Sequence, residues 1–330
     1  MPDREAMATS LTWDNRYLLF LLWSLADHSG VISDVGVSRI AKMACMTKDQ
    51  VEGQLSKLHR LEYIRHQVGG VSSSHLFGRK AGVVFLNAKH PSFANLEGGG
   101  NWVSFLLPAG DGALADLEQA FYRANKIGDA YARFNQAKER LNAGEESGSQ
   151  QDPSAISPDD ADTGDDLYLE RLRNRIQVRE QEFTALAGEF EKAVCGLRSN
   201  VSEEASGANP IGLYEAFLKS NRGVRRFAEM IVCRYASELL CLNNALDAMD
   251  AAILAAIKQD VCPRSRLENE QWARALAGKF YEFSWCLAGE LRGVIEHKLG
   301  LSRGETFEPG RVLIIPCAGF QTIEVLVNKS

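Results

Sequence analysis

Residues 37–64 read VSRIAKMACMTKDQVEGQLSKLHRLEYI, and this stretch decides the fold of the N-terminal part of the chain. Ile40 and Ala41 predict the inner face of a short first helix. Thr47 and Gln50 have the spacing of a capping box, in which two side chains satisfy backbone N–H groups at a helix start. The apolar residues of a second helix then recur at steps of four, three and three: Val51, Leu55, Leu58 and Leu61. The stretch therefore predicts two short helices joined by a tight turn.

The flanking segments predict one more helix and three strands. Residues 63–68 (YIRHQV) are typical of a strand, residues 69–74 (GGVSSS) of a flexible tip, and residues 75–87 of the returning strand. Upstream, residues 12–27 predict a helix, and residues 30–33 (GVIS) a short strand that pairs with the hairpin. The apolar stripe expected on the upstream helix consists of Tyr17, Leu18, Leu21, Leu22 and Leu25.

This order of elements over residues 10–90 resembles the winged helix-turn-helix domains of bacterial transcription regulators and replication initiators. The resemblance implies that helix 47–61 enters the major groove of DNA and that the hairpin contacts phosphate or the minor groove. The residues expected nearest the base edges are Lys48, Gln50 and Gln54, on the helix that Thr47 begins. Those expected at the DNA backbone are Arg39, Lys57, Arg60, Arg79 and Lys80. Two residues depart from the pattern, because Gly53 weakens the second helix and Glu52 would repel phosphate.

The charge distribution favours the same partner. Residues 36–95 contain nine Lys or Arg and three Asp or Glu. Their net charge of +6 leaves −12 for the rest of a chain whose total is −6. A locally basic module on an acidic protein is the expected electrostatic footprint of a duplex-binding protein. The alternative is that these charges are only solvated and that the module binds proteins.

Composition and motifs exclude several other classes. The 330 residues contain no run of eighteen apolar residues and no basic-then-apolar leader, so neither a membrane span nor secretion is expected. The seven cysteines (45, 195, 233, 241, 262, 286 and 317) have no paired spacing, which indicates reduced thiols in a cytoplasmic protein without a zinc site. Cys45, in the turn, is expected to be a small buried residue. The known catalytic and nucleotide-binding motifs do not occur, so we expect neither an enzyme nor a cofactor.

The remainder of the chain predicts three further segments. Residues 91–142 form a connecting loop, a short strand at 102–107 and a long helix from Ala113 to Leu141. Residues 143–166 carry eight acidic and no basic residues, which predicts a disordered linker. Residues 167–330 predict a helical bundle, with a heptad seam at 169–197 and helices over 214–260 and 267–299. A C-terminal β-hairpin at 311–327 should pack on the bundle or across a dimer axis.

The expected fold is thus mainly α (α+β), with an N-terminal winged helix-turn-helix, a helical bundle and a C-terminal hairpin. The function that fits best is a dimeric, sequence-specific transcription regulator of a bacterium or mobile element that binds double-stranded DNA. The C-terminal half would set the dimer and sense a ligand or a protein partner. Two alternatives are open: a replication or partition factor of a plasmid or phage, and a protein-interaction adaptor that does not bind DNA.

Overall fold

The computed structural model describes most of the chain outside its N-terminus and its central region. The described ranges are 11–27, 29–87, 89–93, 101–108, 112–147, 221–242, 250–267, 269–300, 312–317 and 322–329, with isolated positions between 174 and 217. They are mostly helical and contain small antiparallel sheets. The chain divides into two compact units, residues 1–118 with 220–330 and residues 119–219. The first unit therefore contains residues from both the N-terminal and the C-terminal part of the sequence.

The N-terminal helices pack around one small apolar core. They are α2 (Trp13–Leu25), α3 (Val37–Ala44) and α4 (Lys48–Arg60), and the strand β1 (Val31–Ile32) lies between α2 and α3. Three residues of the predicted α4 stripe, Val51, Leu55 and Leu58, are buried, as are Ile40 and Ala41 of α3. The fourth, Leu61, caps the end of the helix and is only half-buried. On α2 the prediction is wrong for Tyr17, which is 50% exposed, because the core contacts come from the adjacent Leu18, Leu19 and Leu22.

A long hairpin follows α4 and is made of four strands: β2 (Ile64–Val68), β3 (Val71–Ser73), β4 (Gly78–Lys80) and β5 (Val83–Leu86). β5 pairs with β2 on one side and with β1 on the other, so the sheet order is β1-β5-β2, all antiparallel. The two arms approach closely where glycines face each other. A Cβ at Gly82 would lie 2.6 Å from the carbonyl oxygen of Val68, and one at Gly70 would lie 2.8 Å from that of Lys80.

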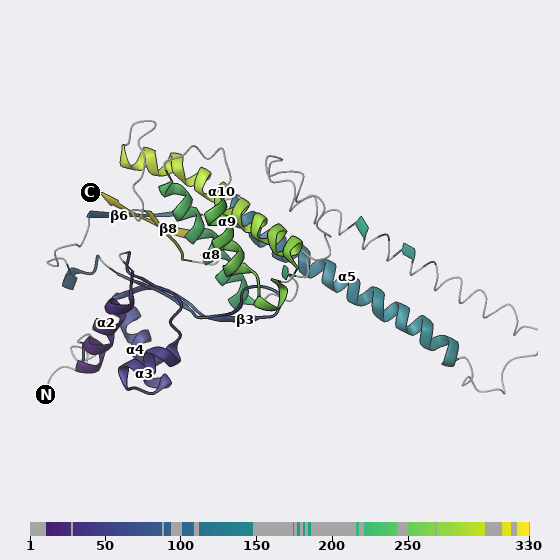
Figure 1. The fold of residues 1–330 in the computed structure, drawn as a ribbon, viewed down its shortest axis with the longest axis horizontal. Helices are drawn as coiled ribbons and strands as arrows, with labels where there is room; N and C mark the ends of the chain where they lie inside the picture. The colour runs from purple at the N-terminus through teal and green to yellow at the C-terminus, as the bar shows by residue number, and fades with distance from the viewer. Residues whose placement is uncertain are drawn as a thin grey trace, which may run out of the picture. The chain divides into compact units, whose positions relative to one another are not determined.

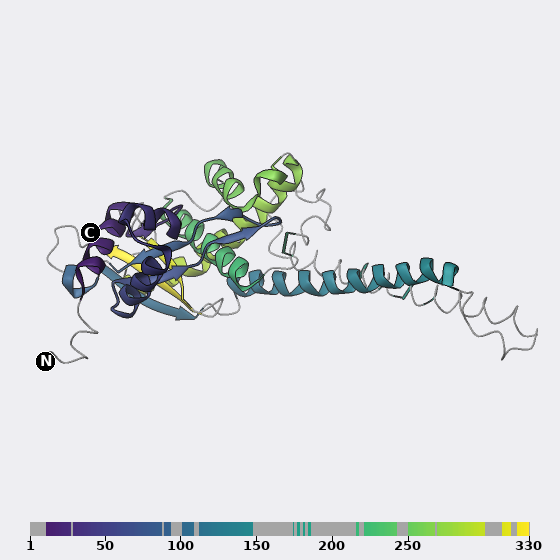
Figure 2. The same ribbon diagram turned by 90° about the horizontal axis from the view of Figure 1, so that it is seen from below.

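The tip of the long hairpin lies at residues 74–77, which corrects two expectations. Residues 71–73 of the expected flexible tip form β3, and residues 75–77 turn the chain before the returning strands begin. Leu76 and Phe77 are buried, and Phe77 packs edge-on against Phe227 at 5.0 Å and Phe280 at 5.9 Å between ring centroids. The N–H of Phe77 donates to the carbonyl oxygen of Val261 at 2.9 Å. Figures 1 and 2 show the hairpin running from the N-terminal helices to the C-terminal ones. The tip is therefore part of the core of the C-terminal helices.

Three helices form the C-terminal part of this unit: α8 (Arg222–Cys241), α9 (Ala251–Val261) and α10 (Glu270–Leu299). α10 packs against both of the others (Figure 1). Residues 214–260 thus contain two described helices, α8 and α9, in place of the continuous one expected. α9 ends just before Cys262-Pro263, because proline cannot donate a helical hydrogen bond and restricts the residue before it.

The C-terminal hairpin is confirmed, but it is not alone. β7 (Val312–Pro316) and β8 (Thr322–Lys329) pair antiparallel, and β6 (Asn101–Pro108) pairs along the other edge of β8. The resulting sheet has the order β6-β8-β7, and β7 packs against α8. A two-stranded hairpin is marginal in water, and here the third strand comes from the same chain.

The long helix α5 (Ala113–Ser147) begins where predicted and continues into the first residues of the expected linker. Its first N–H group, that of Ala113, donates to the Glu290 carboxylate of α10 at 2.9 Å. In the second unit, Phe121 of α5 and Phe217 pack edge-on at 4.9 Å. The rest of the expected linker, and most of the heptad seam at 169–197, lie outside the described residues. No helix within the described ranges is long and apolar enough to cross a membrane.

Candidate nucleic-acid interface

The turn between α3 and α4 has the geometry that the sequence predicts, with one exception. Cys45 ends α3 in the left-handed conformation (φ 54°), and the N–H of Met46 donates back to the Ala41 carbonyl oxygen at 3.0 Å. The left-handed conformation directs Cys45 away from the core, so this residue is exposed and not buried as expected. This compact turn sets the angle between the two helices.

Thr47 and Gln50 form the predicted capping box at the start of α4. The Thr47 hydroxyl accepts a hydrogen bond from the backbone N–H of Gln50 at 3.2 Å. The side-chain amide oxygen of Gln50 in turn accepts one from the backbone N–H of Thr47 at 2.8 Å. These bonds satisfy backbone donors that a helix start leaves without partners. The Gln50 amide nitrogen is left for an external acceptor, whereas its oxygen is used within the fold.

Gln54 has a structural contact that the sequence did not predict. Its side-chain amide oxygen accepts a hydrogen bond from the side-chain amide nitrogen of Asn15 on α2, and Asn15 is fully buried. This bond helps to fix the rotation of α4 about its axis, together with the buried side chains Val51, Leu55 and Leu58. Gln54 therefore stabilises the packing of α2 against α4, and its side-chain oxygen is not free to accept a hydrogen bond from a base.

The outer side of α4 is exposed and carries residues of both charges. Its exposed positions are Lys48, Asp49, Gln50, Glu52, Gly53, Ser56, His59 and Arg60. Arg39 on α3 is exposed, and Lys57 is half-buried. Within the described ranges no acidic side chain forms an ion pair with Arg39, Lys48, Lys57 or Arg60. These four cations are therefore available to an anionic partner.

The two basic residues of the long hairpin differ from each other. Arg79 is exposed on β4 and has no ion pair within the described ranges. The Lys80 ammonium lies 2.9 Å from the carboxylate of Asp260, which also accepts the Tyr235 hydroxyl at 2.8 Å and lies 3.3 Å from Arg234. Together with the buried Phe77, this ion pair holds the hairpin against the C-terminal helices. Lys80 is therefore a structural cation in this fold.

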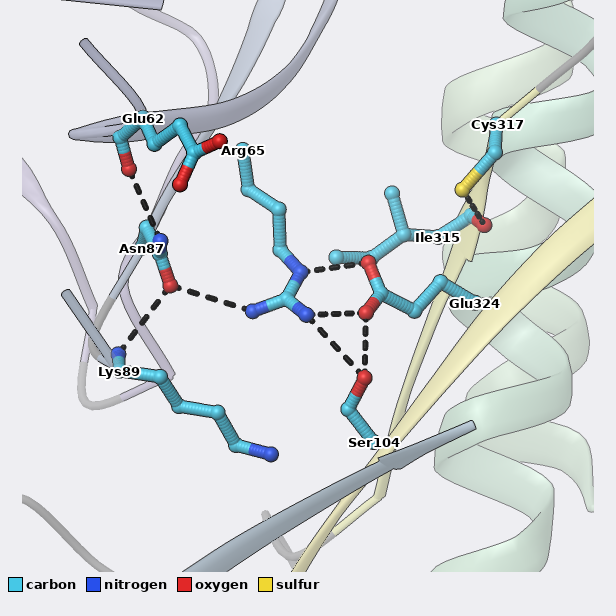
Figure 3. Close-up of polar contacts among 8 residues, drawn as sticks. All are labelled: Glu62, Arg65, Asn87, Lys89, Ser104, Ile315, Cys317 and Glu324. Atoms are coloured by element: carbon cyan, nitrogen blue, oxygen red, sulfur yellow. Dashed lines mark hydrogen bonds and ion pairs between the residues drawn. The ribbon is translucent and has the colours of Figure 1, made fainter. Parts of the chain in front are cut away.

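Arg65 of β2 is also engaged internally (Figure 3). Its guanidinium forms an ion pair with Glu324 of β8 and donates to Ser104 at 3.1 Å and Asn87 at 3.2 Å. Burial alone would raise the pKa of Glu324, but the hydrogen bonds from Arg65 and Ser104 outweigh it and lower this pKa. Burial, followed by the charges of Arg226 and His59, lowers the pKa of His66. The basic module is thus less positive at its surface than its sequence indicates.

An aromatic stripe on α2 was not recognised from the sequence. Trp13 is 82% exposed, Tyr17 50% and Phe20 73%, at successive steps of four and three residues. The Arg16 guanidinium lies 5.4 Å from the centroid of the Trp13 ring. Large apolar side chains recur at helical spacing along two sides of α2, and only the side with Leu18, Leu19 and Leu22 faces the core. Spacing alone therefore could not tell the buried stripe from the exposed one.

No metal centre is found among the described residues, since none of their His, Cys, Asp and Glu side chains form a group of three that could hold an ion. Comparison with known proteins gave no match: no family model, curated protein or solved structure corresponds to the chain. The function must therefore be inferred from the residues and their geometry.

Proposed function

We propose that residues 10–90 form a winged helix-turn-helix domain that binds double-stranded DNA, and that the chain is a sequence-specific transcription regulator. The element order α2–β1–α3–α4–hairpin, with β1 paired to the returning strand β5, supports this assignment. The observation that carries the proposal is α4 itself, since one side of this helix is locked to the core and its other side is exposed, beside cations without internal partners. A helix presented in this way fits the major groove.

The proposed contacts follow from which side chains the fold leaves free. Lys48, at the exposed start of α4, and the amide nitrogen of Gln50 are placed nearest the base edges. Arg39, Lys57 and Arg60 neutralise phosphates, which fixes the position of the domain but carries no sequence information. Glu52 opposes this attraction, and its carboxylate could accept a hydrogen bond from a cytosine amino group in the major groove.

The proposed role of the long hairpin differs from that of a free wing. With Phe77 buried and Lys80 paired to Asp260, the exposed side chains of the hairpin that are left to approach DNA are Gln67, Ser72, Ser74 and Arg79. The hairpin then acts mainly as a rigid connection between the DNA-binding helices and the C-terminal helices.

We further propose that the regulator is a dimer formed through the aromatic stripe of α2. Three large aromatic side chains at one helical spacing are costly to leave in water, and two copies of the same stripe can cover each other across a two-fold axis. A second copy of this chain is therefore the proposed occupant of that surface.

Salt-dependent binding to a short random-sequence duplex tests the DNA-binding proposal. Each phosphate contact contributes about 0.9 to the slope of log affinity against log salt, so the double variant Lys57→Ala/Arg60→Ala should lower that slope by ~1.8. The matched control is Arg274→Ala, which removes an exposed arginine of α10 and should leave the slope unchanged. Affinity that does not depend on salt, or no binding at low salt, would overturn the proposal and favour the adaptor.

A further inference from the structure

A cavity of about 490 Å³ lies between the N-terminal sheet and the C-terminal helices. Val31 of β1, Phe85 of β5 and loop residues such as Asp27 line one part of it. Residues of α8, α9 and β7, with Asp250 just before α9, line the rest. Small-molecule sites in proteins commonly have volumes of 300–1,000 Å³, mostly apolar walls and a few polar groups. The cavity has these properties, and the proposed DNA contacts do not use any of its residues.

Apolar side chains from three elements supply the walls. Phe85, Met230 of α8 and Ile253 of α9 line the cavity, and all three are buried in the fold. Burial of apolar ligand area against such walls is worth roughly 25 cal/mol per Å² before the costs of association. The cavity is therefore suited to a ligand with an apolar body.

Three carboxylates line the same cavity, and within the described part of the chain each has one oxygen that accepts no hydrogen bond. One oxygen of Asp27 accepts the N–H groups of Ser29 and Val31 at 2.8 and 2.9 Å. One oxygen of Asp250 accepts two N–H groups at the start of α9, at 2.8 and 3.0 Å. One oxygen of Glu238 accepts from Arg234 at 3.3 Å. No described residue donates to the second oxygen of any of the three.

Arg234 is the one basic side chain among the described residues that line the cavity, so its single positive charge does not neutralise the three carboxylates. Arg234 lies 3.3 Å from Glu238 and also 3.3 Å from Asp260, which is outside the cavity. Its charge is therefore shared between two carboxylates. Burial raises the pKa of Glu238, and the charge of Arg234 opposes that rise.

We propose that the cavity binds a small organic cation, a primary amine or ammonium compound with an apolar body. The body packs on Phe85, Met230 and Ile253, and the cationic head is held by the free oxygens of Glu238 and Asp250. A hydrogen bond from a charged donor to a carboxylate is stronger than one from a neutral donor, so the site should prefer an ammonium ligand to a neutral ligand of the same shape. An anion of the same shape meets three carboxylates and one arginine, and is rejected.

The site also joins the two parts of the unit. Its walls include β1 and β5, which belong to the sheet of the proposed DNA-binding domain, and α8 and α9, which hold the tip of the long hairpin. A bound cation would therefore change DNA affinity to the extent that it favours one arrangement of these walls. This coupling rests on the proposed function, whereas cation binding itself does not.

The test uses three probes of one shape: 4-phenylbutylamine, 4-phenylbutanol and 4-phenylbutyrate, each titrated calorimetrically into the full chain. The amine should bind about tenfold more tightly than the alcohol, and the carboxylate should bind more weakly than either. Glu238→Gln should remove most of the preference for the amine over the alcohol. Equal affinities for the amine and the alcohol, or a preference for the carboxylate, would overturn the proposal.

A matched pair of variants locates the binding site. Ala252→Trp places a bulky side chain in the cavity and should abolish amine binding, whereas Ala255→Trp adds the same side chain at an exposed position of α9 outside the cavity. Ala252→Leu is the milder variant if Ala252→Trp does not fold. Amine binding that survives both cavity variants would contradict the assignment. Amine binding without DNA binding would overturn only the proposed function, and the reverse would overturn only the cation site.

Discussion

Arg65 and Glu324 are 259 residues apart in the sequence, and their side chains form a partly buried, bidentate ion pair between β2 and β8. Ser104 of β6 donates to the same carboxylate (Figure 3). One arginine of the basic N-terminal module thus links three segments of the chain. Because the guanidinium is satisfied within the fold, Arg65 stabilises the connection between the two sheets and is not available to DNA.

This ion pair predicts a loss of stability in acid. The pKa of Glu324 is lowered in the folded state from its ordinary value of 4.5. An acid of this kind stabilises the fold above its unfolded pKa, and the stabilisation is lost as the pH falls through the folded pKa. At neutral pH, Glu324→Gln should lower the free energy of unfolding by about 3 kcal/mol, because it leaves the Arg65 charge partly buried and unpaired.

Urea unfolding of both proteins as a function of pH checks this prediction. The difference in free energy of unfolding between wild type and Glu324→Gln should be largest at neutral pH and should shrink as the pH falls below 4.5. A difference that stays constant into acid would show that the Glu324 charge contributes nothing to the fold.

The buried hairpin tip predicts a contrast between two neighbouring substitutions. Phe77→Ala should destabilise the protein by about 3–5 kcal/mol, because it removes a ring packed between Phe227 and Phe280. Arg79→Ala, two residues away and exposed, should change stability by less than about 0.5 kcal/mol. Chemical denaturation of both variants measures the contrast, and equal small effects would mean that the tip is free in solution.

The elements of the N-terminal region could be predicted from sequence because their signals are local. The capping box of Thr47 and Gln50 and the buried stripe of α4 depend on residues within one or two helical turns. The positions of Lys80 and Arg65 could not be predicted in the same way, because their partners, Asp260 and Glu324, follow them by 180 and 259 residues. Counting charges in a segment treats every cation as free, and the fold uses two of them internally.

The hairpin tip shows the same limit. Gly69–Ser74 is typical of a flexible turn, and nothing in that composition indicates a partner. The available signal was the apolar pair Leu76-Phe77 next to so polar a tip, because two such side chains are seldom left in water. Their partners on α8 and α10 could not be identified from the sequence alone.

The contact between Gln54 and Asn15 predicts a division of roles on α4. Gln54→Ala should cost about 1–2 kcal/mol of stability, because it leaves the buried Asn15 amide without its acceptor. Lys48→Ala should cost almost no stability and should weaken DNA binding. Measuring the free energy of unfolding and the duplex affinity of each variant tests this division. A Gln54→Ala variant that is as stable as wild type but prefers a different base would contradict it and would show that Gln54 contacts a base.

The aromatic stripe of α2 predicts the association state. The double variant Trp13→Ser/Phe20→Ser removes two large exposed rings and should convert a dimer to a monomer without loss of helix content. Sedimentation equilibrium and circular dichroism measure the two properties. Asp14→Ser, on the same helix turn, is the matched control and should stay dimeric. A wild-type protein that sediments as a monomer at all concentrations would contradict the proposed dimer.

Selection of bound duplexes from a random-sequence library, at low salt and again at physiological salt, tests the central claim most directly. We predict that the full chain enriches a recurrent motif, that the motif is an inverted repeat, and that Lys48→Ala/Arg60→Ala, in which two exposed cations of α4 are removed, loses the enrichment. Repeated sites in one direction would instead favour an origin-binding role for the same helix. No enrichment by the wild-type chain under either condition would contradict the claim that α4 binds DNA.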